Sequence, residues 1–269
     1  MSSYLNIYSN LLQFIETHNF KSKFKSGKKT EIKDFSNKSR KNFIYFINSI
    51  RIDEFKFNYF LTLTYHNDWP LDFKNLKLDL KKFLIYSRRE FKPFEYLWKL
   101  ELQKRKAPHF HLTFHFKEIL TPNEQKFFHE KINSIWNEIT SCKCQYCRRY
   151  KTRVYIITNQ FVFYSYISKE ISKEKQTQPV KLGRFWGHSK GLKPFKWATE
   201  EITREEWESI KSKLLDNPKF SKRLKQYLDK LPDHVDPKNF FIPSDTSLKI
   251  FFEVFEKRFS NLNNQETNK

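Results

Sequence analysis

The sequence predicts an α+β fold, in which a ferredoxin-like (RRM-like) antiparallel sheet carries helices on one face, with flanking N- and C-terminal helices. The segments 58–65, 95–103 and 108–116 alternate apolar and polar side chains, and 153–158 is rich in β-branched residues, as expected of strands. The segments 72–90 and 121–139 repeat apolar residues every three or four positions, which indicates amphipathic helices. With a further helix predicted over 159–175, the order β-α-β-β-α-β-α is typical of a ferredoxin-like sheet.

Changes in composition divide the 269 residues into four expected regions. Residues 1–56 are expected to form a basic, helical N-terminal extension, with helices near 4–17 and 39–50. Residues 57–195 hold the predicted sheet and its helices. Residues 196–259 are expected to be helical, with helices over 201–232 and 247–259, and the polar segment 260–269 is expected to be a disordered tail.

The charge balance points to a polyanionic partner. Lys and Arg number 51 against 30 Asp and Glu, for a net charge of +21, and the excess is concentrated in 21–41 and 141–193. A nucleic acid is the favoured partner over a membrane surface, and a Lys-rich solvated surface is the alternative. No apolar run reaches the roughly 18 residues of a membrane span, and the N-terminus lacks a secretory pattern, so a cytoplasmic protein without a membrane partner is expected.

The strand at 108–116 carries the candidate metal ligands, because its side chains alternate between two faces. One face presents His109, His111, Thr113 and His115, and the other is entirely apolar. If residues 104–108 form the turn, Gln103 pairs with His109 and Glu101 with His111, so that Glu101 lies beside one imidazole and diagonal to the other.

Two imidazoles and a carboxylate suit a borderline divalent ion such as Mn²⁺, with Mg²⁺ as the alternative at cellular concentrations. Such an ion polarises a phosphoryl oxygen and orients a scissile phosphate. Two other interpretations stay open: histidines on a half-exposed face without any metal, and a mononuclear iron site, which uses the same donors.

The predicted helix after the last strand carries a candidate nucleophile. At about 100° per residue, Tyr166, Lys169 and Lys173 share one side of this helix, whereas Tyr164 lies on its apolar stripe. Neighbouring ammonium groups favour the phenolate of Tyr166 and neutralise a phosphate. An ordinary tyrosine on a basic helix is the alternative.

Taken together, three motifs resemble those of the HUH rolling-circle replication initiators of plasmids and phages, over roughly residues 57–195. They are Phe60-Leu-Thr-Leu-Thr-Tyr65, then Pro108-His-Phe-His-Leu112, then Tyr166-Ile-Ser-Lys169. The segment Gly183-Arg-Phe-Trp-Gly-His-Ser-Lys190 also resembles a segment of these replication proteins. Many relatives carry a second tyrosine four residues after the first, where this chain has Glu170, which points to a single-tyrosine enzyme.

The resemblance implies the HUH endonuclease fold and a metal-dependent transesterification on single-stranded DNA at a replication-origin hairpin, with a host helicase and polymerase as further partners. It implies that His109 and His111 are metal ligands, that Glu101 is the third ligand and that Tyr166 is the nucleophile, assisted by Lys169. The expected DNA contacts are Lys173, Arg184, Trp186 and Lys190, with Trp69, Phe185 and Trp186 able either to stack on bases or to pack in the core.

Three alternatives remain at this point. A relaxase or a single-tyrosine transposase would use the same chemistry on a different DNA structure. A basic DNA-binding module would lack catalysis, and a nuclease that activates water through a metal would form no covalent adduct.

The three cysteines predict a zinc site. Cys142, Cys144 and Cys147 are spaced much as in zinc knuckles, and His129 is a candidate fourth ligand. Protein purified without chelators is therefore expected to contain close to one zinc per chain by elemental analysis, and the content should fall in Cys144→Ser. Metal-free protein with three titratable thiols would contradict the prediction.

Overall fold

The computed structural model describes residues 2–8, 11–17, 35–50, 55–65, 69–70, 72–103, 105–141, 152–158, 183–216 and 239–241. The chain forms two compact units, each assembled from separate stretches of sequence. The terminal unit comprises Met1–Lys25, Tyr45–Arg51 and Pro194–Lys269, and the central unit comprises Ser26–Ile44 and Ile52–Lys193. Helix α1 (Asn37–Ser49) has residues in both units.

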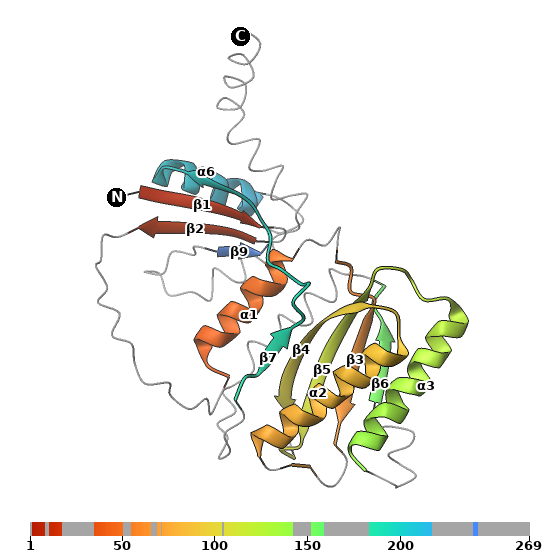
Figure 1. Cartoon of the computed structure of the whole chain (residues 1–269). Helices are drawn as coiled ribbons and strands as arrows, with labels where there is room; N and C mark the ends of the chain where they lie inside the picture. The colour runs from red at the N-terminus through yellow and green to blue at the C-terminus, as the bar shows by residue number, and fades with distance from the viewer. Residues whose placement is uncertain are drawn as a thin grey trace. The chain divides into compact units, whose positions relative to one another are not determined.

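The central unit contains a five-stranded antiparallel sheet with the strand order β6-β3-β5-β4-β7 (Figure 1). In chain order its elements are β3 (Tyr59–Thr64), α2 (Phe73–Glu90), β4 (Phe94–Leu102), β5 (Pro108–Phe116), α3 (Pro122–Ile139), β6 (Thr152–Ile156) and β7 (Trp186–His188). The first four strands lie in the order fourth, first, third, second, as in a ferredoxin-like sheet, and β7 is added beside β4. The predicted α+β fold is confirmed.

Helices α2 and α3 cover one face of this sheet and form the core with it (Figure 1). Alternate residues of β3 and β5 point toward the helices, where Phe83 of α2 and Phe128 and Trp136 of α3 are fully buried against them. The Trp136 indole donates a hydrogen bond to the Thr64 carbonyl at 3.0 Å, which ties α3 to the end of β3. The other face of the sheet carries no such helix layer from α2 or α3, and we call it the open face.

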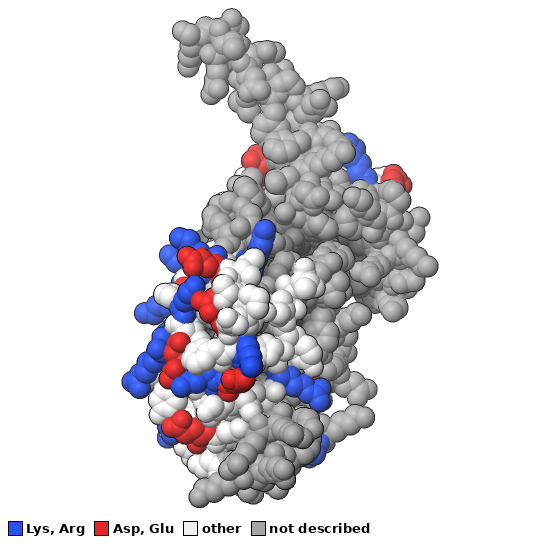
Figure 2. All heavy atoms as spheres, turned by 90° about the vertical axis from the view of Figure 1, so that its right-hand side faces the viewer, with Lys and Arg blue, Asp and Glu red and all other residues white. Residues whose placement is uncertain are grey.

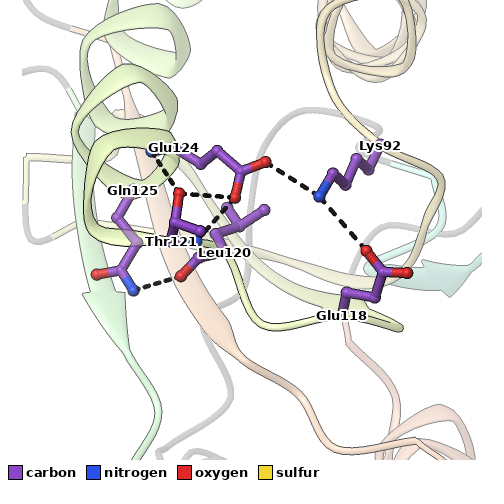
Figure 3. Close-up of polar contacts among 6 residues, drawn as sticks. All are labelled: Lys92, Glu118, Leu120, Thr121, Glu124 and Gln125. Atoms are coloured by element: carbon purple, nitrogen blue, oxygen red, sulfur yellow. Dashed lines mark hydrogen bonds and ion pairs between the residues drawn. The ribbon is translucent and has the colours of Figure 1, made fainter.

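The start of α3 is fixed by a capping box (Figure 3). The Thr121 hydroxyl accepts from the Glu124 backbone N–H at 3.4 Å, and the Glu124 carboxylate accepts from the Thr121 N–H at 2.8 Å. Lys92, which lies just before β4, pairs with Glu124 at 3.0 Å and with Glu118 at 3.4 Å. The hydrogen bond from the Thr121 backbone, followed by the ion pair with Lys92, lowers the pKa of Glu124 to about 2. The sequence prediction that Thr121 caps this helix is confirmed.

The α3 side of the molecule carries charges of both signs. Figure 2 shows basic and acidic side chains interspersed over the described part of this face. The ion pair between Lys131 of α3 and Glu90 of α2, at 3.1 Å, is one example. The positive excess of the chain is therefore not concentrated on this part of the surface.

The terminal unit contains a second antiparallel sheet with the order β8-β1-β2-β9. Its elements are β1 (Ser2–Tyr8), β2 (Leu11–Thr17), β8 (Lys196–Glu201), α6 (Arg204–Asp216) and β9 (Asn239–Phe241). Trp207 of α6 is fully buried and stacks on Phe14 of β2, with ring centroids 4.9 Å apart. The contact fixes α6 against this sheet.

The helix predicted near 4–17 is wrong, because these residues form the β1–β2 hairpin. Leu5 and Ile7, then Leu12 and Phe14, alternate with polar neighbours and are at most 2% exposed, so the period is that of a strand. The basic N-terminal extension is thus not mainly helical in its described part. Residues 196–201 likewise form strand β8, where a helical region was expected.

Other predicted helices have different outcomes. The helix expected over 39–50 is confirmed as α1, and α6 confirms the first part of the helix expected over 201–232. The helices predicted over 159–175 and 247–259 and the tail 260–269 lie outside the described residues, so the four-region division stays a prediction. No helix in the described ranges combines the length and the apolar character needed to cross a membrane.

Lys77 of α2 lies within the apolar layer between the helix and the sheet. Its ammonium nitrogen is 3.8 Å from the centroid of the Trp98 ring and 5.4 Å from that of Phe110. Burial lowers the pKa of Lys77 to about 7, because the charged form loses its hydration.

We expect Lys77→Met to stabilise the protein by roughly 1–4 kcal/mol at pH 7, since a buried charge is replaced by an apolar side chain of similar length. The folded state binds fewer protons than the unfolded state between the folded pKa of about 7 and the ordinary lysine value. Stability of the wild type should therefore rise with pH across this window, and this rise should be smaller in Lys77→Met. Thermal unfolding at several pH values checks both effects. The exposed Lys81→Met on the same helix is the control, and a destabilised Lys77→Met would contradict the argument.

Candidate active site on the open face of the sheet

The histidine face predicted for β5 lies on the open face of the central sheet. Because side chains alternate along each strand, the same face receives Thr62 and Thr64 from β3 and Lys99 and Glu101 from β4. The helix-facing residues of β5, from Phe110 to Phe116, are at most 1% exposed. The predicted assignment of faces therefore agrees with the structure.

The predicted pairing of β4 with β5 is wrong by two residues. Glu101 pairs with His109, and Lys99 with His111. The turn is closed around Gln103, whose N–H donates to the Ala107 carbonyl at 3.0 Å, and Lys106 adopts a positive φ of 65°. A lysine at the position where glycine or asparagine is usual leaves the turn without its sequence marker. A shift of two residues keeps every side chain on its face, so the composition of the site is unchanged.

The two histidines and Glu101 lie close together. The His111 Nε2 atom is 3.0 Å from a Glu101 carboxylate oxygen, and the two imidazole centroids are 4.5 Å apart. Glu101 is thus opposite one histidine in the ladder and in contact with the other, as the diagonal geometry allows.

Hydroxyl groups of β3 lie beside the second nitrogen of each ring. The His109 Nδ1 atom is 2.9 Å from Thr64 Oγ1, and His111 Nδ1 is 3.5 Å from Thr62 Oγ1. Gln103 also contacts His109 Nδ1, at 3.3 Å. Contacts of this kind fix the orientation of imidazoles that serve as metal ligands or proton carriers.

The donor set is compatible with a divalent cation. Two ligands at about 2.1 Å and a right angle on an octahedral ion are about 3.0 Å apart, which is the separation of His111 Nε2 and Glu101 Oε2. His109 supplies a second imidazole beside this pair. Within the described part of the chain, however, no three His, Cys, Asp or Glu side chains are already grouped as a metal site.

Two contributors to this region were not singled out from the sequence. Lys99 is only 7% exposed and places a cation on the histidine face, directly across from His111. Arg105 donates to the Gln103 side-chain oxygen at 2.9 Å and to the Tyr65 carbonyl, and its guanidinium lies 5.3 Å from the centroid of Trp69. The period of two in β4 could have identified Lys99, whereas the Arg105 contacts depend on the turn.

The predicted DNA contacts near β7 have mixed outcomes. Arg184 and Lys190 are exposed. Trp186 packs at 5.3 Å on Phe43 and donates to the Ser39 hydroxyl at 3.2 Å. Phe185 is 7% exposed and stacks on Phe35, so of its two expected roles the structure favours packing in the core.

The predicted nucleophile and zinc ligands lie outside the described residues. This holds for Tyr166, Lys169 and Lys173, and also for Cys142, Cys144 and Cys147. His129, the suggested fourth zinc ligand, is an exposed residue of α3. Their roles stay predictions.

Comparison with known families gives one match. A family model for replication-associated proteins of the ORF2 type matches residues 58–175, somewhat less than half of the chain. No curated protein and no solved structure matches the chain significantly. The matched segment contains β3, both histidines, Glu101 and the predicted Tyr166 helix. The similarity supports a role for this chain in the initiation of DNA replication.

Proposed function

We propose that this protein is a rolling-circle replication initiator of the HUH type, which nicks and rejoins single-stranded DNA at a plasmid or phage origin. The observation that carries the proposal is the grouping of His109, His111 and Glu101 on the open face of a sheet that lies within the segment similar to replication-associated proteins. The positive net charge of the chain supports a DNA substrate.

His109, His111 and Glu101 would hold Mn²⁺ or Mg²⁺, and a zinc ion at the cysteine cluster is a separate proposal. When bound, the divalent cation would act as a Lewis acid on a phosphoryl oxygen. Thr62 and Thr64 would keep the imidazoles oriented, and Lys99 would offset negative charge beside them.

Tyr166 would attack the scissile phosphodiester. Its phenol oxygen forms a bond to phosphorus while the bond from phosphorus to the 3′ oxygen breaks; the phenol loses its proton and the departing 3′ oxygen gains one. The products are a 5′-phosphotyrosyl adduct and a free 3′-OH that can prime a host polymerase. Only about 0.1% of an ordinary tyrosine is ionised at pH 7, a cost of roughly 4 kcal/mol, which Lys169 and Lys173 would reduce.

The same residues would serve a relaxase or a single-tyrosine transposase, which differ in the DNA that they recognise. A non-catalytic DNA-binding module is the alternative of another class. The contact between His111 and Glu101 on the open face favours the enzyme, because a binding module has no need of this donor set.

Tyr166→Phe is expected to abolish both cleavage and the covalent adduct, whereas Tyr164→Phe should retain both. Removing one oxygen deletes the nucleophile with little change in packing, so DNA binding should survive. Labelled single-stranded origin DNA is incubated with the protein and Mn²⁺, and adducts that resist denaturation are counted on a gel. Lys169→Ala should slow cleavage without ending it. A Tyr166→Phe protein that still becomes linked to DNA would refute the assignment.

Mn²⁺ is expected to raise the thermal unfolding midpoint of the wild type but not of His111→Ala. A ligand at one hundred times its dissociation constant stabilises the folded state by about 2.7 kcal/mol. His109→Ala and Glu101→Ala should behave in the same way, and all three should lose nicking while retaining most DNA binding.

The matched control for the metal is His115→Ala. His115 lies on the same strand and face, but its Nδ1 contacts the Lys56 carbonyl at 2.7 Å. Loss of the Mn²⁺ effect in His115→Ala, or its persistence in His111→Ala, would contradict the proposed site.

A further inference from the structure

A row of three rings crosses the open face from the histidine pair to the β6 edge of the central sheet. Phe60 of β3 stacks on His111, with centroids 5.3 Å apart and an angle of 17° between the rings. Tyr155 of β6 pairs with Phe60 in the ladder, and its ring centroid is 6.4 Å away at an angle of 32°. The rings therefore lean in similar directions, and Tyr155 is the outermost.

The outer end of this row is exposed. Tyr155 is 50% exposed although it belongs to a regular strand, and Phe60 behind it is half-buried. The Tyr155 ring therefore presents part of its surface to solvent, next to two rings that are already ordered.

The opposite side of the same face differs. Trp186 of β7 is packed on Phe43 and hydrogen-bonded to Ser39, so its ring is engaged within the chain. The aromatic surface that is open to a ligand is thus on the β6 side.

A cation lies beside the exposed ring. Arg153 precedes Tyr155 by two residues on β6 and is exposed on the same face, paired with Thr62 in the ladder. A flat ring next to a guanidinium suits a ligand that offers a planar apolar group and an anion in close succession. A single strand of nucleic acid does so, since its bases are free to stack and each is linked to a phosphate. A duplex does not, because its base faces are already covered.

We propose that Tyr155 and Arg153 form a subsite for one unstacked base of single-stranded DNA and its adjoining phosphate. A base stacked on the outer face of Tyr155 would continue the row His111–Phe60–Tyr155, which places that nucleotide next to the histidine pair. The assignment rests on the proposed function for the identity of the strand, and it adds a residue pair that anchors the strand beside the site of cleavage.

The test is the affinity of the full-length protein for a fluorescein-labelled oligothymidylate, measured by fluorescence anisotropy without divalent metal. Tyr155→Ala is expected to bind about tenfold or more weakly, and Tyr155→Phe close to wild type, because stacking needs the ring and not the hydroxyl. Arg153→Ala should reduce the slope of log affinity against log salt by about 0.7, the value for one phosphate.

Two matched variants control for damage to the fold. Ile156→Ala alters the neighbouring residue of β6, which is equally exposed at 50% but points to the other side of the strand. Phe127→Ala removes an aromatic side chain of similar exposure, 49%, from α3 on the helix-covered face. Both should bind as the wild type does.

A second measurement locates the base. Each nucleotide of the strand is replaced in turn by an abasic one. The wild type should lose affinity at one position in particular, and Tyr155→Ala should lose nothing further there.

Wild-type affinity in Tyr155→Ala would overturn the subsite, as would an equal loss in Ile156→Ala or in Tyr155→Phe. A wild-type protein that does not bind the single strand would also overturn it. The proposed function fails separately: protein that binds the strand through Tyr155 but forms no Tyr166 adduct in the presence of Mn²⁺ would end the nicking proposal and leave the subsite in place.

Discussion

The alternation of side chains along β5 is the constraint on which the candidate site depends. Its apolar residues are buried against α2 and α3, and this burial fixes which side chains can face the other way. A pairing error of one residue would drive histidines into the core and phenylalanines onto the open face, at a cost of several buried side chains. The packing of the helix layer therefore holds His109 and His111 in position, even though no helix residue need touch them.

The two strands beside β5 complete the environment of each imidazole in different ways. Strand β3 offers a hydroxyl at the Nδ1 side of both rings, and β4 offers a carboxylate to His111 and a buried cation across from it. Phe60 adds a ring that stacks on His111. Each imidazole is thus oriented by neighbours on separate strands, so the geometry of the site follows from sheet pairing and not from a mobile loop.

The sequence was informative wherever periodicity decided the answer. It predicted the strands of the central sheet, its two helices and the face of His109 and His111, because a period of two or of 3.6 is a local property. It was wrong about residues 4–17, where alternation over short stretches resembled a helical pattern until the pairing partners, β2 and the distant β8, were known. It also missed the register of the β4–β5 turn, since Lys106 adopts a backbone conformation that lysine does not announce. The burial of Phe185 could not be read from its neighbours because its partner, Phe35, is far away in sequence.

The terminal unit has a consequence for how the chain is made. Strand β1 leaves the ribosome first, yet its partner β8 begins at Lys196, after the whole of β3 to β7 has been synthesised. The central unit can therefore fold during translation while β1 and β2 wait as an incomplete hairpin, with one edge unpaired. Two-stranded hairpins are marginal in water on their own. The last step of folding is thus set by the downstream half of the chain, and a ribosome that stalls before β8 would release a protein that carries the histidine pair but lacks a completed terminal sheet.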